Sequence, residues 1–412
     1  MSPTSTRLEK DTRGSYDTGP IVSVSLQEAA QRLQSVITRA CKGLVQREVA
    51  VQLVVLAAVA REHVLLIGPP GTAKSEAVRR VAAGLGGHYF EYLLGRFTEP
   101  AEVFGPVDLQ KLREGVVETQ TRGMLPEAEV AFLDEVFLGS TAILNTLLGV
   151  LNERTFRRGH TQLECPLRVC VGASNTLPDD PSLAAFSDRF LLHLFLQPIA
   201  DAHLETLLDA GWSLQAEREP ASAEPALPAL DVLIDAARTV DVAPIRAHLA
   251  EAVRILRGAG INLSDRRIVK VQKLVAAAAV LDGRDEAHGA DLWPIVFALG
   301  SPEEQDRARD LLRETLEASA NASLGTAAEN ASLGPLARAA RIEKTAEALL
   351  QLDLRAADDT ARRRWKLRLE GVAREIDATF PPDAQPESLQ NTRSLIAERI
   401  AEDPGGPAPS HG

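Results

Sequence analysis

An apolar run that leads directly into a small-residue loop constrains this chain more than any other feature. Residues 63–67 read His-Val-Leu-Leu-Ile, and residues 68–75 read Gly-Pro-Pro-Gly-Thr-Ala-Lys-Ser. A short apolar run that ends at Gly and Pro is typical of a buried parallel strand. The loop after it follows, with one exception, the pattern G-x-x-x-x-G-K-[ST], in which a strand leads into a phosphate-binding loop and a helix. The sequence therefore predicts a nucleotide site.

Each part of the loop has an expected role in holding a triphosphate. Small residues let backbone N–H groups approach phosphate oxygens, and the helix dipole favours negative charge at the helix start. We expect Lys74 to reach the β- and γ-phosphates and the Ser75 hydroxyl to bind Mg²⁺. The predicted ATP-binding residues are Gly68, Pro69, Pro70, Gly71, Thr72, Ala73, Lys74, Ser75 and Glu76.

Ala73 is the one departure from the pattern, because a glycine is usual at this position. An alanine there would be strained if the backbone needed a positive φ angle. The alternative interpretation is a glycine-rich turn that binds nothing. The placement of Lys74 and Ser75 between an expected strand and an expected helix favours the nucleotide site.

Composition narrows the class of protein. The 412 residues are 45% hydrophobic and 25% charged, which fits two or three globular domains. The net charge of −12 argues against a protein whose main task is to bind nucleic acid. Three cysteines without a C-x-x-C pair fit a reducing compartment. We find neither an apolar run long enough to span a membrane nor a signal-peptide core, and expect a cytoplasmic protein.

Strands alternate with helices through the first half of the chain, and helices dominate the rest. The alternation predicts an α/β fold, with a parallel sheet that carries helices on both faces. After the strand at residues 63–67, the expected strands are residues 88–94, 131–135, 167–173 and 190–196. The expected units are a disordered arm (1–24), an α/β nucleotide-binding domain (25–200), an all-helical lid (201–300), a helical C-terminal extension (301–380) and a mostly disordered tail (381–412).

Polar residues follow the expected strands at their carboxyl ends. An open parallel sheet binds ligands at that edge, so we expect Gly68, Asp134, Glu135 and Asn175 in one crevice. Asp134 would hold Mg²⁺ together with Ser75. Glu135 would orient and deprotonate the attacking water, and Asn175 would bind that water or the γ-phosphate. Taken singly, the acids could end a strand in solvent and the asparagine could be a turn residue.

Two arginine positions are further candidates. Arg189 follows Asp188 just before the last expected strand, and alone it is an ordinary surface or ion-paired arginine. An arginine inserted at a γ-phosphate contributes about 10³–10⁵ in rate. Ser264 is expected to cap a helix whose first turn contains Arg266 and Arg267. Cations are unfavourable there, which is a mild indication of contact with an anion.

Further motifs, longer than the loop, lie at residues 91–97, 102–106, 125–129, 132–135, 142–148, 152–159, 173–175 and 264–267. Taken together, these motifs point to one family. The chain resembles the MoxR-family AAA+ ATPases, specifically the RavA (regulatory ATPase variant A) branch, over residues 25–300. That family's loop also tolerates alanine at the position of Ala73.

The resemblance implies a homo-oligomeric ring, usually a hexamer, with ATP held between subunits. It implies a chaperone-like remodeller of protein complexes that works with a partner carrying a von Willebrand factor A domain. Residues 107–122 and 154–166 resemble family insertions that face a pore or a client. The matching site residues are Lys74 (loop), Ser75 and Asp134 (magnesium), Glu135 (base), Asn175 (sensor 1), Arg189 (a finger toward the neighbouring subunit) and Arg266 (sensor 2), with Arg267 as the alternative.

Two other functions stay open at this point. A nucleic-acid-stimulated AAA+ motor is disfavoured by the acidic balance and by the lack of a recognition helix. A nucleotide-gated assembly scaffold with little turnover is compatible with the sequence. A preference for GTP is unsupported, because the chain has no Asn-Lys-x-Asp element.

Overall fold

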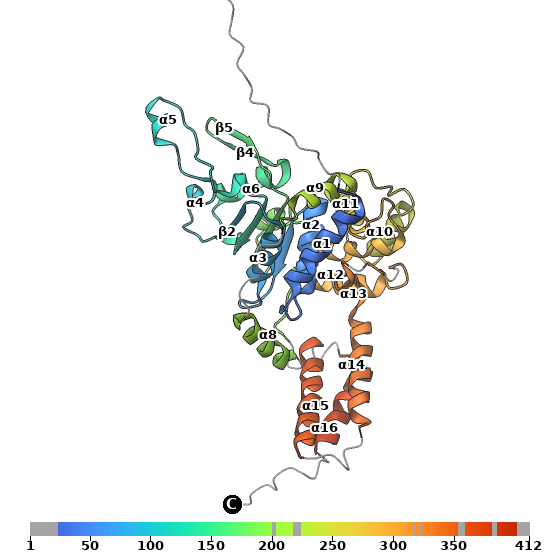
Figure 1. Cartoon of the computed structure of the whole chain (residues 1–412). Coiled ribbons are helices and arrows are strands. Elements are labelled where there is room, and N and C mark those ends of the chain that lie inside the picture. Colours follow the sequence, from blue (N-terminus) through green and yellow to red (C-terminus); the bar gives the residue numbers. More distant parts are fainter. Residues whose placement is uncertain are drawn as a thin grey trace, which may run out of the picture.

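A computed structural model describes most of the chain (Figure 1). The expected N-terminal arm, apart from Val24, and the end of the tail lie outside the described residues. The described ranges are residues 24–199, 203–216, 224–316, 319–321, 323–352, 359–380 and 385–401.

A five-stranded sheet forms the centre of the molecule, in the order β2-β3-β6-β1-β7. All neighbouring strands run parallel, with Leu66 of β1 opposite Ala173 on one side and Leu194 on the other. The predicted parallel α/β fold is therefore confirmed. The strands are β1 (Val64–Ile67), β2 (Tyr89–Leu93), β3 (Val130–Asp134), β6 (Val169–Ser174) and β7 (Leu192–Phe195).

Alternate residues of each strand enter two different cores. Val64 and Leu66 belong to one buried cluster, and Leu65 and Ile67 belong to the cluster on the other face. This is the two-residue period expected of a strand that is covered on both sides. The first face carries α1 (Leu26–Cys41), α2 (Glu48–Ala60) and α3 (Lys74–Leu85), and the second carries α4 (Pro100–Phe104), α6 (Thr141–Glu153) and α7 (Pro181–Ser187).

Helix α2 is buried along nearly its whole length, because the helical lid covers the side that faces away from the sheet. A helix that is apolar all round needs such a position. The lid shares the core of the sheet domain, and residues 289–291 and 293–298 of this expected all-helical unit form 3₁₀ turns. Its elements are α9 (Leu227–Ala237), α10 (Arg246–Gly258), α11 (Asp265–Leu281), η4 (Gly289–Asp291) and η5 (Trp293–Ala298), followed by α12 (Pro302–Leu311) and α13 (Gly325–Ser332).

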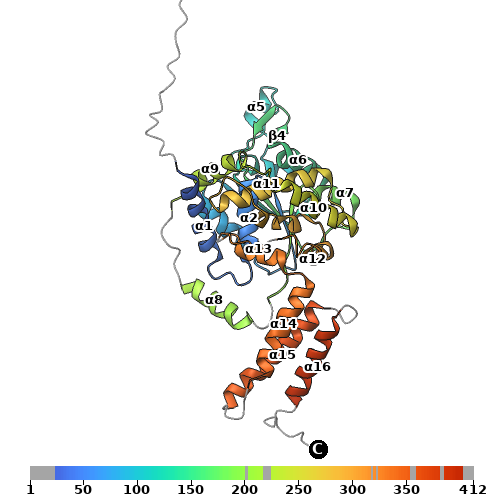
Figure 2. The same cartoon turned by 90° about the vertical axis from the view of Figure 1, so that its right-hand side faces the viewer.

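The last three helices form a bundle that projects from the rest of the molecule (Figures 1 and 2). They have a small core of their own, and Trp365 Nε1 donates to Leu349 O at 2.8 Å. Part of the expected disordered tail is helical, because Leu389 and Ile396 are fully buried in this bundle. The helices are α14 (Pro335–Leu350), α15 (Asp359–Thr379) and α16 (Glu387–Ala401).

Three segments project from the sheet domain or lie apart from it (Figure 1), although Phe156 at the base of one of them is fully buried in the second core. Residues 107–122, which resemble a family insertion, form a loop that is bridged between Val107 and Thr119 and contains a short helix capped by the Asp108 side chain. Trp212 of α8 is 77% exposed, and α8 lies apart from the sheet. The segments are α5 (Leu109–Arg113), the hairpin of β4 (Thr155–Arg158) and β5 (Thr161–Glu164), and α8 (Leu204–Ala216). Two short 3₁₀ turns, η1 (Leu125–Glu127) and η2 (Val136–Leu138), flank β3 of the sheet. Within the described ranges, no helix combines the length and apolar character needed to cross a bilayer.

Candidate nucleotide site

The phosphate loop joins β1 to α3 at the carboxyl edge of the sheet. Gly68 N donates to Ser174 O of the neighbouring strand at 3.1 Å. A Cβ atom on Gly68 would lie only 2.4 Å from Leu196 O, just beyond β7. Glycine is therefore required for the loop to approach β7 this closely. Gly71 has a φ angle of +79°, which glycine adopts without strain.

Ala73 takes the left-handed conformation, with φ 59° and ψ 29°. Its Cβ atom makes this conformation cost about 1–2 kcal/mol relative to the right-handed one. Glu135, at the end of β3, is also left-handed, with φ 49°. Strained non-glycine residues of this kind tend to gather at functional sites. Ala73 belongs to the loop for which the sequence predicts contact with ATP, and Glu135 is the residue that it predicts as the base.

The start of α3 is left without a side-chain cap. By contrast, serines cap α1, α6 and α11 through Ser25, Ser140 and Ser264, the last as predicted. The first N–H groups of an α-helix have no acceptor within the helix. An uncapped helix start after a glycine-containing loop fits an anion, because its N–H groups and its dipole both favour negative charge.

Lys74 lies over this loop. Its Nζ donates to Gly68 O at 2.6 Å and to Pro69 O at 3.2 Å, and the residue is only 8% exposed. Burial lowers the pKa of Lys74, while the charges of Asp134 and Glu135 act to raise it. The two carboxylates are therefore close enough to Lys74 for their charges to act on it.

Glu135 and Asn175 meet across two neighbouring strands. Asn175 Nδ2 donates to Glu135 Oε1 at 2.6 Å, and Glu135 N donates to Asp134 Oδ1 at 3.0 Å. The amide group fixes one carboxylate oxygen and leaves the other available. Such a carboxylate, held by a neighbour near a phosphate site, is positioned to accept a proton from water.

The oxygen atoms available near the loop fit magnesium. In the described part of the chain, no group of three or more His, Cys, Asp or Glu side chains could hold a metal by itself. Magnesium bound with a nucleotide does not need such a cage, because phosphates and waters supply most of its ligands. Ser75 and Asp134 offer a hydroxyl and a carboxylate. Glu76 is engaged elsewhere, with Arg79 at 3.1 Å and Arg80 at 2.7 Å.

Sequence reasoning missed Arg47, which holds the phosphate loop in place through hydrogen bonds. Its Nε donates to Thr72 O at 2.7 Å, and its Nη2 donates to Gln197 O at 2.9 Å. The residue is 5% exposed, and burial lowers its pKa. It fastens the loop to the segment that follows β7. A lone arginine before an apolar helix was the only signal in the sequence.

The candidate arginines lie at the amino ends of the strands, whereas the phosphate loop lies at their carboxyl ends. Arg189 precedes β7 at its amino end and pairs with Asp188 at 3.6 Å, while its buried Nε has no hydrogen-bond partner among the described residues. Arg266 Nη2 donates to Asn152 Oδ1 at 2.7 Å, at the end of α6. The length of β1 separates the amino ends of the strands from the phosphate loop. Neither Arg189 nor Arg266 therefore contacts Lys74 of the same chain.

Arg267 has a structural role that distinguishes it from Arg266. It is 8% exposed and joins the lid to the sheet domain, with Nη1 donating to Asp188 Oδ1 at 2.8 Å and Nη2 to Leu191 O at 2.8 Å. Its donors are thus committed within the chain. Arg266 is exposed and is the one able to face a second molecule.

Comparison with family models decides the family. Residues 31–234 match the model described as the MoxR domain in the MoxR-vWA-beta-propeller ternary systems, and residues 240–311 match an AAA lid domain. The chain belongs to the MoxR family of AAA+ ATPases. The lid match ends in α12, so the bundle of α14, α15 and α16 in this MoxR protein lies beyond both matched regions.

Individual relatives are more distant. Two uncharacterized proteins of Methanocaldococcus jannaschii resemble this MoxR protein: MJ0812 is 36% identical over 251 residues (60% of this chain, 65% of the relative), and MJ0079 is 34% identical over 269 residues (65% and 70%). The chain thus spans roughly two thirds of each. Protein MoxR of Methylorubrum extorquens is 26% identical over 199 residues (45% and 54%). A candidate ATPase of Cytophaga hutchinsonii shares the fold, with a TM-score of 0.58 at 16% identity, covering 70% of this chain and 95% of that one.

Proposed function

We propose that this MoxR protein is a ring-forming ATPase that couples ATP hydrolysis to chaperone-like remodelling or activation of protein complexes. The observation that carries the proposal is the hydrogen bond of 2.6 Å between Asn175 and Glu135, beside the uncapped start of α3 and Lys74. A site that only bound phosphate would need no oriented carboxylate. Glu135 is therefore assigned as the base that activates water.

The chain's own groups divide the work as follows. The N–H groups at the start of α3 and the Lys74 ammonium hold the phosphates, while Ser75 and Asp134 hold magnesium. Bound magnesium supplies neutralisation of the charge that develops on the phosphates. Asn175 keeps Glu135 directed at the site.

The position of the arginines supports a ring. Arg189 and Arg266 both lie near the amino ends of the strands, away from Lys74 of the same chain. In a head-to-tail arrangement, the side of one subunit that carries the amino ends would meet the side of the next subunit that carries the carboxyl ends. Arg189 would then reach the γ-phosphate held by the neighbour, and its unpaired Nε would gain a partner. A hexamer is the expected closed form.

The family model supports a partner with a von Willebrand factor A domain, because its description names such ternary systems. We propose that α5 and the hairpin β4–β5, which project from the sheet domain in Figure 1, meet the client or the partner. A cytoplasmic location is part of the same proposal. Membership of the RavA branch rests on the sequence motifs alone and stays a prediction.

Steady-state phosphate release tests the hydrolytic site. Lys74→Ala should abolish turnover because the cation facing the phosphates is lost. Glu135→Gln should keep ATP binding and lose turnover by about 10²-fold or more, the size expected of a general base. Glu153→Gln, an exposed carboxylate at the end of α6, is the matched control and should not change the rate. Normal turnover of Glu135→Gln would show that Glu135 is not the base.

Mixed rings test the shared site. Subunits carrying Arg189→Ala and subunits carrying Glu135→Gln are each expected to be inactive alone. Mixing them creates some junctions with an intact finger and an intact base, so partial activity should return. No recovery at any mixing ratio would refute a contribution from the neighbouring subunit.

Two measurements separate the alternatives. A nucleic-acid motor would show ATPase activity that DNA stimulates in a salt-dependent way. A nucleotide-gated scaffold would assemble with ATP and release almost no phosphate. Affinity capture with the Glu135→Gln form and ATP should retain a von Willebrand factor A protein, and consistent failure to do so would count against the proposed partner.

A further inference from the structure

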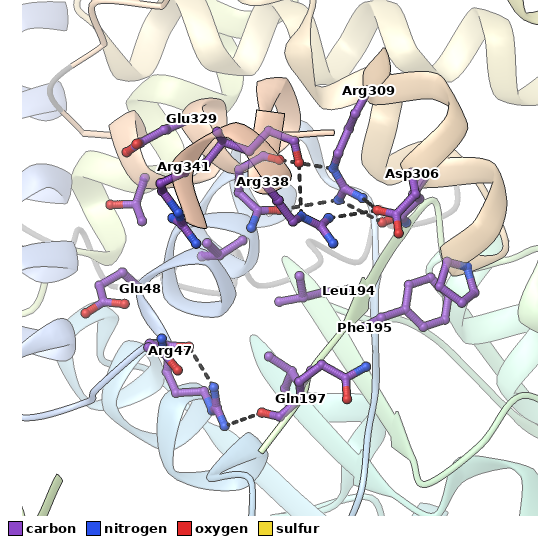
Figure 3. Close-up of a pocket in the computed structure, with 18 of the residues that line it drawn as sticks. Arg47, Glu48, Leu194, Phe195, Gln197, Asp306, Arg309, Glu329, Arg338 and Arg341 are labelled. Carbon is purple, nitrogen blue, oxygen red and sulfur yellow. Dashed lines mark hydrogen bonds and ion pairs between the residues drawn. The ribbon is translucent and has the colours of Figure 1, made fainter. Parts of the chain in front are cut away.

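Two cavities lie between the sheet domain and the helical parts of the chain. Arg47 and Gln197 line the first, beside the phosphate loop (Figure 3), and it adjoins the nucleotide site already described. The second, called the lid cavity below, has a volume of about 750 Å³ and lies between the sheet domain and the lid. Its sheet-domain wall includes residues 59–62, just before β1, and residues 151–154, at the end of α6. The lid cavity therefore lies at the amino ends of the strands.

Part of the lid cavity is apolar. Ile234, Val240 and Val242 of the lid line it together with Val59 and Leu151 of the sheet domain. Val240 and Val242 are only partly buried within the chain. This wall thus keeps apolar surface that a side chain from a second molecule can remove from water, which is favourable in proportion to the area covered.

The rest of the lining carries more cations than carboxylates. Glu62 accepts from Lys270 at 2.5 Å and from Lys273 at 2.9 Å, so one carboxylate serves two lysines. Burial and the charges of neighbouring arginines lower the pKa of Arg61. A segment that carries both an apolar side chain and carboxylates would therefore complement the lid cavity. The lining contains three glutamates against six cations, which are Arg61, Arg154, Arg238, Arg266, Lys270 and Lys273.

The other side of the sheet domain presents an apolar turn directly after β2. Phe97 is 95% exposed, and Leu93 at the end of β2 is 64% exposed. The turn is fixed by its own hydrogen bonds, because Gly95 N donates to Thr98 Oγ1 at 2.9 Å and Thr98 N donates to Gly95 O at 3.1 Å. A fixed turn that holds an aromatic side chain in solvent is suited to anchor an interface, since aromatic residues are enriched at the buried centres of interfaces.

Carboxylates and the nucleotide site both adjoin this turn. Glu99 and Glu102, at the start of α4, are exposed. Leu94 N donates to Asp134 O at 2.9 Å, which ties the turn to the end of β3 beside the nucleotide site. Arg266 lines the lid cavity and is the exposed arginine on the side assigned to the next subunit. In a head-to-tail ring, the turn and the lid cavity would thus meet at the same junction.

We infer that the turn at residues 94–99 of one subunit enters the lid cavity of the next, with Phe97 against the apolar wall and the carboxylates of α4 toward the cations. This inference rests on the ring of the proposed function and adds a contact that holds each junction together. A head-to-tail contact needs two different, complementary surfaces on every subunit. The turn at the carboxyl ends and the cavity at the amino ends form such a pair.

Sedimentation velocity on the full-length protein, with ATP and Mg²⁺, tests the anchor. Phe97→Ala should raise the protein concentration needed for half-assembly by about 30-fold or more, the size expected of an interface hot spot. Leu367→Ala is the control, because Leu367 is 63% exposed on α15 and lies outside the turn and the cavity wall. It should assemble like the wild type. Wild-type assembly of Phe97→Ala, or an equal loss in both variants, overturns the inference.

A photo-crosslinker at position 97 identifies the contact directly. With p-benzoylphenylalanine in place of Phe97, irradiation of the full-length protein with ATP and Mg²⁺ should give covalent dimers joined to peptides of α9 or α11, which line the lid cavity. The same amino acid in place of Leu367 is the control and should not label those peptides. Rings that form without such crosslinks, or crosslinks that reach a different surface, overturn the inference.

The behaviour of the wild type separates this inference from the proposed function. If the wild type stays monomeric with saturating ATP and Mg²⁺, the proposed ring is wrong and the inference falls with it. If the wild type assembles and Phe97→Ala assembles equally well, the ring stands and only the role of the turn is wrong.

Discussion

Acidification should loosen the contact between the lid and the sheet domain through His193. This residue of β7 is 2% exposed, with Nδ1 3.3 Å from Arg267 Nη2 and Nε2 3.2 Å from Ser187 Oγ. Burial, reinforced by the charge of Arg267, lowers the pKa of His193 to about 3. Protonating the ring would place two cations in contact in the buried connection that holds the lid.

The magnitude follows from the difference between the folded pKa of about 3 and an unfolded pKa of about 6.5. The folded pKa is depressed, so the unfolded state binds the proton more readily and stability is lost as the pH falls below about 6.5. Between about pH 7.5 and about pH 5, this one group should remove about 2 kcal/mol from the free energy of unfolding.

Urea unfolding at the two pH values measures the effect. In His193→Gln, which keeps a side chain able to donate and accept, the loss on acidification should be smaller than in the wild type by about 2 kcal/mol. His63 is also buried with a lowered pKa, but it is present in both proteins and cancels in the comparison. An equal acid-induced loss in variant and wild type would refute the assignment to His193.

Three substitutions test the loop. Gly68→Ala should destabilise the fold by about 1–3 kcal/mol in urea unfolding, because its Cβ would lie 2.4 Å from Leu196 O; unchanged stability would contradict the close approach. Arg47→Ala should raise the Kd for ATP, measured by calorimetry, because Thr72 O loses its buried donor; an unaltered Kd would show that the loop needs no such support. Ala73→Gly should stabilise the fold by up to about 1 kcal/mol by relieving the left-handed strain, and a decrease in the urea midpoint would argue against that strain.

Local patterns predicted most of the site because its residues lie at the ends of strands. The apolar run before Gly68 identified β1, and the acids after residue 133 marked the same edge of the sheet. Parallel strands then bring Asn175 and Glu135 together through simple geometry, as their hydrogen bond shows. The sequence also indicated that Ala73 would be strained if its φ angle were positive, and the structure shows that φ is 59°.

What the sequence did not reveal depends on contacts between segments far apart in the chain. Arg47 reaches Thr72 and Gln197, which lie 25 and 150 residues away. No periodicity encodes such contacts. For the same reason, the burial of Arg267 against β7, and hence the choice of Arg266 as the available arginine, required the folded chain.

Helix α14 is a rigid rod anchored at one end. A Cβ atom on Gly334, just before it, would lie 2.1 Å from Asp310 Oδ1, so this end is tightly confined against α12. Its 16 residues span about 24 Å. A tilt of about 10° at Gly334 would swing Leu350 through about 4 Å, a displacement comparable to the width of a methyl group. A small change of angle at Gly334 would thereby become a larger displacement at the far end of α14, inside the bundle of α14, α15 and α16.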